Sequence, residues 1–242
     1  MPTDTTVSKR GRFAAGYDRT LGKLIPHYAL VSLPFCLIST FLYSVAQALP
    51  RFAEPINIMT AWDRAIPLQS EWVLVYYGSY VFWVVNFVMI SRRGREYWFR
   101  FFAAFFTSAI ITFIVFMVYP ATMERPEITG EGFFPFCMRL MYAADKPINL
   151  LPSFHCLGSW FCALGLHGAR KTPLWYKIFS YVFALLVCAS TLFVRQHCIA
   201  DVVTGVALAQ IMYLVFRKGR LYLPFRRGWE KLEKAVFGFV EE

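Results

Sequence analysis

The chain has 242 residues, of which 57% are hydrophobic and 19% are aromatic. This composition excludes an ordinary soluble domain, and apolar runs of about 18 or more residues predict transmembrane helices. The formal net charge of +10 comes from basic residues that cluster between the apolar runs. Such clustering indicates loops at a membrane surface and argues against a nucleic-acid-binding protein. We therefore expect an all-α, polytopic membrane protein.

Six apolar runs predict six membrane spans, at roughly 28–49, 71–90, 101–119, 152–168, 178–194 and 198–216. Pro50 closes the first run, Pro120 follows the third, and Pro152 suits the first turn of the fourth. A basic tail at 1–27 precedes the spans. A second basic tail at 217–242 is expected to be amphipathic and to lie at the membrane interface. The first run lacks a small-residue cleavage site, which indicates a retained helix.

The distribution of Lys and Arg predicts the orientation in the membrane. The two tails and the loops after spans two and four hold 19 of these residues, whereas the other three loops hold 6. The positive-inside rule then makes both termini cytoplasmic. The loops after spans three and five, and the start of span four, would lie on the extracytoplasmic face of the cell membrane.

Two of the four histidines lie on that extracytoplasmic face. His197 lies between spans five and six, and Asp201 follows it by four residues. On a helix, residues with this spacing share a face, so the carboxylate can fix the ring tautomer and stabilise its cation. His155 lies at the start of span four, on the same face, while His27 and His167 fall toward the opposite side. Ionisable residues in membrane segments are costly and indicate function.

Cationic side chains are expected near these histidines. Arg125 and Lys146 belong to the loop at 120–151, which is expected to cover a bound headgroup. Cations of this kind can hold the non-bridging oxygens of a phosphate, while one histidine attacks phosphorus and the other protonates the leaving oxygen. Backbone N–H groups around Ser153 and Phe154, at a helix N-terminus, would add donors. The set indicates phosphate chemistry.

Some side chains on this face allow more than one interpretation. Ser153 can act as a nucleophile, or as a helix cap or phosphate donor. Arg195 can bind phosphate or extend to the interface as an ordinary arginine. Cys156 follows His155, but adjacent residues on a helix point in different directions and do not chelate together. The cysteine spacing predicts neither a zinc site nor a disulfide framework, and we expect no metal and no cofactor.

These residues resemble the pattern of the type 2 phosphatidic acid phosphatase (PAP2) superfamily, which runs KxxxxxxRP, PSGH and SRxxxxxHxxxD. The matching residues are Arg125 and Pro126 in the first block, Pro152, Ser153 and His155 in the second, and Ser190, His197 and Asp201 in the third. Phe154 replaces the glycine of the second block. The resemblance covers roughly residues 70–216. It implies a six-helix transmembrane bundle at 28–216 with a catalytic core at about 100–216.

The resemblance also implies roles for individual residues. His197 would be the nucleophile that forms a phosphohistidine, Asp201 would orient it, and His155 would be the general acid, without a metal. Two phosphate-binding positions of the family differ, because its lysine is Val118 here and its arginine is Thr191. Such a changed anion site resembles the branch that includes inositol phosphorylceramide synthase-like and sphingomyelin synthase-like enzymes.

Lys146 and Arg195 are the nearest cations to replace the two missing family residues. The function expected from the sequence is a metal-independent lipid phosphate phosphatase. It would hydrolyse a phosphomonoester or diphosphate of a membrane lipid. A lipid phosphotransferase, which passes a phosphoryl group or phospho-headgroup to another lipid alcohol, is the alternative within the same chemistry. A non-catalytic lipid transporter and a catalytically dead scaffold are alternatives of other classes.

Overall fold

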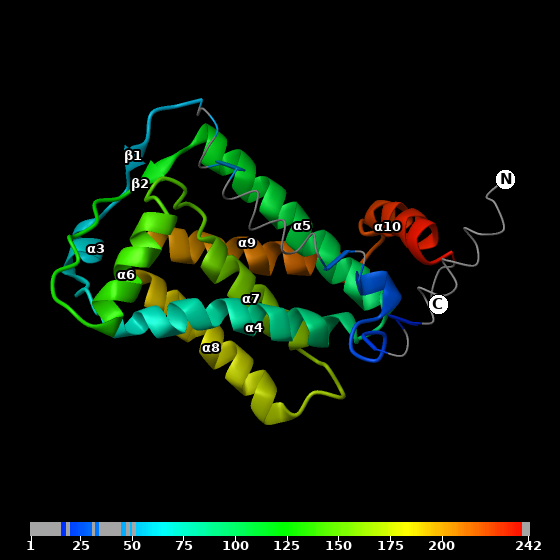
Figure 1. The fold of residues 1–242 in the computed structure, drawn as a ribbon. Helices are drawn as coiled ribbons and strands as arrows, with labels where there is room; N and C mark the ends of the chain where they lie inside the picture. Colours follow the sequence, from blue (N-terminus) through cyan, green and yellow to red (C-terminus); the bar gives the residue numbers. More distant parts are fainter. Residues whose placement is uncertain are drawn as a thin grey trace.

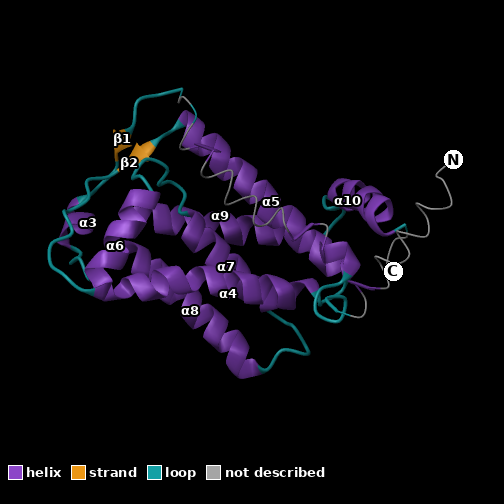
Figure 2. Ribbon diagram, in the orientation of Figure 1, coloured by secondary structure: helices purple, strands orange, loops and turns teal. Residues whose placement is uncertain are grey.

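The computed structural model describes residues 16–17, 20–30, 32–33, 45–46, 49 and 52–238. This part of the chain is mostly helical and includes one pair of two-residue strands (Figures 1 and 2). The expected first span, 28–49, lies mainly outside the described residues, and the prediction for it stays untested.

Four described helices are long and apolar enough to cross a membrane. They are Ser70–Ser91, in which the 3-10 turn η1 (Ser70–Trp72) leads into α4 (Val73–Ser91), then α5 (Arg95–Val118), α8 (Leu174–Phe193) and α9 (Ile199–Arg217). Helices of this size are about 28–36 Å long, which matches the hydrocarbon core of a bilayer. The predicted apolar helices at spans two, three, five and six are therefore confirmed. The third and fifth begin several residues earlier than expected.

The expected fourth span, 152–168, is instead the short helix α7 (Phe154–Leu166), which has 13 residues. Its length of about 20 Å is less than the hydrocarbon thickness of about 30 Å. Helix α7 packs against α4, α5, α8 and α9, and all its residues except Trp160 are buried. The apolar run thus reflects a helix enclosed by protein, which hydropathy alone does not distinguish from a span.

Close packing holds α7 at the centre of the bundle. A Cβ on Gly158 would lie 3.1 Å from the Trp83 ring of α4, and one on Gly165 would lie 2.3 Å from the end of the Ile90 side chain. On the other side, Phe161 packs edge-on against the rings of Phe101 and Phe105 from α5. Phe101, Phe105 and Phe161 are at most 2% exposed, so close side-chain contacts hold α7 in place in addition to hydrophobic burial.

Shorter elements gather at the end of the bundle where α7 and α9 begin (Figure 1). They are β1 (Ile56–Asn57), α3 (Ala61–Ala65), β2 (Ala121–Thr122) and α6 (Phe133–Ala144). The strands pair in parallel, with Ile56 opposite Ala121. The segment at 120–151 was expected to be a polar loop, but it contains the 12-residue helix α6. Met138 and Met141 of α6 pack with Tyr76 and Val194, which explains why the helix forms there.

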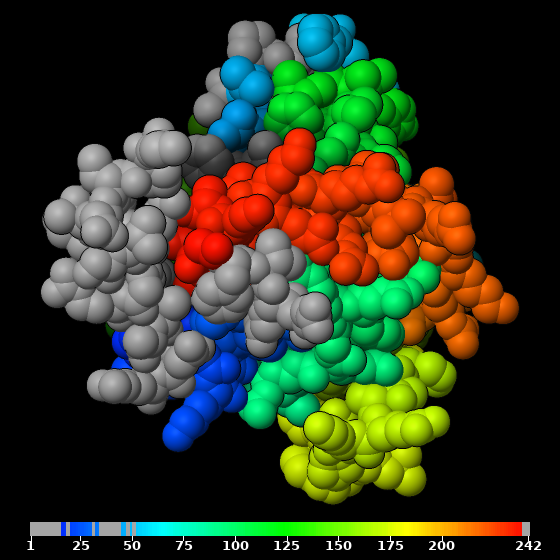
Figure 3. All heavy atoms as spheres, turned by 90° about the vertical axis from the view of Figure 1, so that its right-hand side faces the viewer, coloured from blue at the N-terminus to red at the C-terminus, as the bar shows by residue number. Residues whose placement is uncertain are grey.

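The opposite end of the bundle carries α10 (Leu223–Phe237), which lies within the predicted amphipathic tail at 217–242. Arg95 of α5 forms ion pairs with Glu233 at 2.6 Å and with Glu230 at 3.3 Å. Trp229 packs edge-on against Phe102. Figure 3 views this end and shows α10 in red beside the orange end of α9. The predicted helix is confirmed, and its contact with a membrane surface stays a prediction.

Candidate active site

His197 and Asp201 meet at the start of α9, although not as two residues on one helical face. His197 precedes the helix, in the turn between α8 and α9, and Asp201 is in its first turn. The Asp201 carboxylate caps the helix by accepting the N–H of Cys198 at 2.7 Å, and the same oxygen lies 3.3 Å from Nδ1 of His197. The predicted pairing is therefore present, and helix capping produces it.

The pairing determines the electrostatics of His197. Burial of the ring disfavours its cation, but the nearby Asp201 carboxylate outweighs this effect and raises the pKa of His197. Because Asp201 faces Nδ1, Nε2 is the ring nitrogen suited to attack or proton transfer. The second carboxylate oxygen of Asp201, Oδ1, is buried without a partner among the described residues.

The turn that carries His197 is fixed by its own backbone. The N–H groups of Gln196 and His197 both donate to the carbonyl oxygen of Thr191, at 2.9 and 3.1 Å. Arg195 has a φ of 54°, in the left-handed region that turns the chain sharply. Thr191, which stands where the PAP2 pattern has an arginine, is buried and supplies a carbonyl rather than a cation. Val118, at the family's lysine position, is 58% exposed at the end of α5.

Arg195 contacts α3 in the structure, and its proposed contact with phosphate stays a prediction. Its guanidinium donates to the backbone carbonyls of Asp63, Arg64 and Ile66, at the C-terminal end of α3. These carbonyls occupy both terminal nitrogens, and a cation there also stabilises the helix end. Arg195 therefore joins the His197 turn to α3.

Asp63 completes that junction and was missed by sequence reasoning. Its carboxylate accepts the N–H of Ile199 at 2.7 Å and the N–H of Thr60 at 2.8 Å, and the residue is 2% exposed. Burial opposes ionisation, but the hydrogen bonds from Thr60 and Ile199 and the charge of Arg195 prevail and lower the pKa of Asp63. The Thr60-x-x-Asp63 capping box was the sequence signal that could have marked this helix.

His155 lies in the first turn of α7, directly opposite the His197 turn. Ser153 caps α7 by accepting the N–H of Cys156 at 3.3 Å, which supports the interpretation of Ser153 as a cap. The N–H of Ser153 donates to the backbone carbonyl of Asp201 at 3.0 Å, joining the starts of α7 and α9. As a result, the rings of His155 and His197 have centroids 6.0 Å apart.

Aromatic residues of α4 surround His155, and the sequence did not single them out. The Tyr80 hydroxyl lies 3.2 Å from Nε2 of His155, and the Tyr76 ring centroid lies 4.3 Å from the imidazole centroid. The Trp83 ring is 5.5 Å away by the same measure. The three aromatic residues follow helical spacing along one face of α4, a pattern that also occurs in any packed helix.

Arg125 reaches the His197 turn from the segment before α6. Its guanidinium donates to the side-chain oxygen of Gln196 and to the backbone carbonyl of Asp145, and it lies 4.7 Å from the Tyr142 ring centroid. Gln196 immediately precedes His197, so Arg125 is brought to the site as expected. Lys146 is exposed and follows Asp145, which places it at this end of the bundle.

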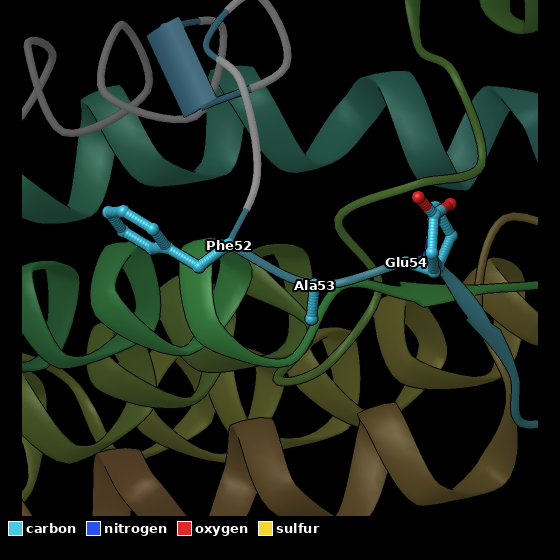
Figure 4. A pocket seen from close by; sticks show the side chains of 4 residues that line it. Phe52, Ala53 and Glu54 are labelled. Carbon is cyan, nitrogen blue, oxygen red and sulfur yellow. The ribbon is translucent and has the colours of Figure 1, made fainter.

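Phe154, the remaining residue of the predicted phosphate-binding set, is buried beside Phe105 and Trp83, at centroid distances of 5.9 and 6.4 Å. Only its backbone N–H, at the start of α7, is suited to a phosphate. Among the residues described, no group of three His, Cys, Asp or Glu side chains converges to hold a metal ion. A separate open hollow, lined by Phe52, Ala53, Glu54 and Pro55, lies on the segment before β1 (Figure 4).

The comparisons with known proteins give limited information about this site. No protein-family model matches the chain, and no solved structure matches it. The chain is similar to an uncharacterized protein, MJ0662, of Methanocaldococcus jannaschii, with 32% identity over 108 residues. The matched region covers 45% of this chain and 41% of that protein's length. The likeness therefore assigns no family and no activity.

Proposed function

We propose that this protein is a metal-independent lipid phosphate phosphatase that works through a phosphohistidine. The observation that carries the proposal is the opposition of His155 and the His197–Asp201 pair, whose imidazole centroids are 6.0 Å apart. Two imidazoles this close together can act on the same phosphate group, one as nucleophile and the other as acid. Arg125 contacts Gln196, the residue before His197, and supplies a cation for the phosphate oxygens.

In the first step, Nε2 of His197 attacks phosphorus, so that an N–P bond forms while the bond to the lipid oxygen breaks. His155 donates a proton to that leaving oxygen, and Asp201 stabilises the charge that develops on the His197 ring. In the second step, a water gives its proton to His155 and attacks phosphorus, and the N–P bond breaks. Inorganic phosphate leaves and both histidines return to their starting protonation states.

The burial of the two histidines affects whether water or a lipid alcohol accepts the phosphoryl group. His155 is 8% exposed and His197 is 5% exposed, and α6 packs over Tyr76 next to them. We infer that the elements at 120–151 move to admit a headgroup and that their closure excludes water. Exclusion of water favours transfer to a lipid alcohol, so a lipid phosphotransferase is the second candidate function. We place the site at the extracytoplasmic face of the cell membrane, in accord with the charge distribution.

The test is a product assay on the purified full-length protein, in detergent with a chelator of divalent metals. Phosphatidate, phosphatidylglycerophosphate and a polyprenyl diphosphate are the substrates, each with and without an added acceptor lipid. Release of inorganic phosphate supports the phosphatase, and a new phospholipid supports the transferase. Alkaline denaturing quench with a phosphate-labelled substrate should trap label on the protein, because the P–N bond of the phosphohistidine intermediate survives base and hydrolyses in acid.

Variants make the assay specific to the proposed residues. His155→Ala should lower turnover by about 10²- to 10⁴-fold, the range for general acid catalysis, and His197→Ala should abolish trapped label. His167→Ala is the matched control, because His167 follows α7 at its far end. Full turnover by His155→Ala and His197→Ala would refute the mechanism. Headgroup binding without turnover of any substrate would support a transporter instead.

A further inference from the structure

A basic pocket opens at the end of the bundle opposite to the histidines. It has a volume of about 760 Å³, and the residues that matter here are Arg93, Tyr97, Arg100, Tyr213 and Arg217, with Gly94 at its rim. These residues come from the turn between α4 and α5, the first turns of α5 and the end of α9. Asp201 and Arg217 are 16 residues apart on α9, so the pocket lies about 24 Å from the candidate active site.

Two of the pocket's arginines keep their charge uncompensated. Arg100 pairs with Glu96 at 2.7 Å, and Arg95 is neutralised by the α10 glutamates. Among the described residues, neither Arg93 nor Arg217 forms an ion pair. Arg93 is held in place, since it stacks 3.7 Å from the Tyr97 ring centroid and donates to the backbone carbonyl of His167 at 3.0 Å. The pocket therefore presents fixed positive charge.

The start of α5 adds backbone donors at the same place. Gly94 precedes the helix with a φ of 106°, and no side chain caps the helix there. The first N–H in the helix to bond within it is that of Trp98, which donates to Gly94 at 2.9 Å. The residues in the first turn of α5 line the pocket, and a helix N-terminus favours an anion.

The pocket is also amphipathic, with an aromatic inner wall. The hydroxyls of Tyr97 and Tyr213 are 3.4 Å apart, and a narrower hollow continues between α5 and α9 to Phe101. Arg93 and Arg217 line the same pocket and supply positive charge. An anionic group joined to an apolar chain would match both parts. The surrounding segments are also the most basic in the sequence, which the positive-inside rule places at the cytoplasmic leaflet.

We propose that this pocket binds the phosphate of an anionic glycerophospholipid of the cytoplasmic leaflet, with Arg93 and Arg217 as the cations and the Tyr97–Tyr213 wall against the glycerol and upper acyl chains. Basic pockets between transmembrane helices on the cytoplasmic side are suited to such headgroups. A soluble phosphate compound shares the anionic chemistry but has no part that matches the aromatic wall. The inference does not depend on the proposed phosphatase activity.

The test measures binding to the full-length protein in a zwitterionic detergent. The probes are dihexanoyl phosphatidylglycerol, dihexanoyl phosphatidylcholine and inorganic phosphate, each titrated by microscale thermophoresis. Phosphatidylglycerol should bind at least tenfold more tightly than either other probe. Arg217→Gln should weaken it about fivefold, from about 1 kcal/mol per basic residue near a membrane surface. Arg217→Lys should retain most of the affinity.

Arg220→Gln is the matched control, because it removes the same charge three residues farther along without lining the pocket. Circular dichroism and thermal unfolding show whether each variant is folded. If Arg217→Gln does not fold, Arg217→Lys still tests the proposal. Equal affinity for phosphatidylglycerol and phosphatidylcholine overturns the proposal, as does an equal effect of Arg217→Gln and Arg220→Gln. Equal affinity for inorganic phosphate overturns the assignment to a lipid.

Discussion

The Asp63 carboxylate accepts the backbone N–H of Ile199 at 2.7 Å, across 136 positions of the chain. Ile199 is the first residue of α9, and the turn before it carries His197. Arg195, in the same turn, donates to backbone carbonyls of α3, the helix to which Asp63 belongs. A five-residue helix in an early loop thus fixes the position of the candidate nucleophile.

Asp63→Asn should destabilise the protein while leaving the shape of the side chain unchanged. Hydrogen bonds to a charged acceptor contribute about 1.5–3 kcal/mol and neutral ones about 0.5–1.5 kcal/mol, so a loss of about 1–2 kcal/mol is expected. For a chain of this size, thermal unfolding in detergent should shift down by about 2–8 °C. Glu71→Gln, at an exposed position, is the control and should shift it little.

The effect of Asp63→Asn should also depend on pH. The folded-state pKa of Asp63 is lowered from 3.8, so its contribution is present above that value and is lost as pH falls through the folded pKa. The difference between wild type and variant should therefore be constant near neutral pH and should shrink only under strongly acidic conditions. A difference that disappears between pH 5 and pH 7 would contradict this assignment.

The His197 ring should titrate in the folded protein with a midpoint above pH 6.5. Attack needs Nε2 of His197 without a proton, and the pKa of His197 is raised from 6.5 because Asp201 outweighs the opposing effect of burial. Removing that carboxylate in Asp201→Asn should lower both the rate and the midpoint. NMR titration of the His197 ring from pH 5 to pH 9 gives the midpoint, and steady-state rates give the loss of turnover. A wild-type midpoint at or below 6.5 would disprove the assignment.

Tyr80→Phe should lower turnover about fivefold and leave substrate affinity nearly unchanged. The change removes the hydroxyl that lies 3.2 Å from Nε2 of His155, a hydrogen bond worth about 1 kcal/mol, and keeps the ring. The expected mechanism is a less well positioned general acid. Tyr77→Phe is the control, since Tyr77 is on the same helix and its hydroxyl lies 3.4 Å from a backbone carbonyl of α6. An equal loss of turnover in Tyr80→Phe and Tyr77→Phe would show that the effect does not depend on the contact with His155.

Gly205→Ala should destabilise the protein and inactivate it. A Cβ at this position would lie 2.5 Å from the carbonyl oxygen of Ser153, a backbone atom that cannot rotate away. Overpacking of this kind costs typically about 1–3 kcal/mol. Gly228→Ala in α10 is the matched control, because nothing lies within 4 Å of its Cβ, and it should stabilise by about 0.5–1 kcal/mol. Unchanged unfolding of Gly205→Ala would contradict the close contact.

Sequence reasoning predicted the long apolar helices and the His197–Asp201 pair because both depend on local spacing. It misjudged α7, since a helix buried in protein and a helix buried in lipid have the same apolar run. It also missed α6. The Phe133–Ala144 stretch has helical spacing and a proline in its first turn, but the charged residues and prolines on both sides of it suggested a loop.

The contacts of the site that could not be predicted are those between distant segments. The carbonyl acceptors of Arg195 lie about 130 positions earlier, and nothing near Arg195 in the sequence indicates them. Tyr80 lies in an apolar run rich in aromatic residues, where its role depends on which face meets α7. A buried arginine is expected to have a hydrogen-bonding partner, but only the tertiary structure determines which residue that partner is.

The starts of α7 and α9 are joined through main-chain atoms, from the N–H of Ser153 to the carbonyl of Asp201. The separation of the two imidazoles is therefore set by backbone geometry and by one position without a side chain, Gly205. This main-chain hydrogen bond does not depend on the identity of the side chains at positions 153 and 201. The spacing that the proposed reaction needs thus rests in part on main-chain atoms, which substitutions of nearby side chains do not remove.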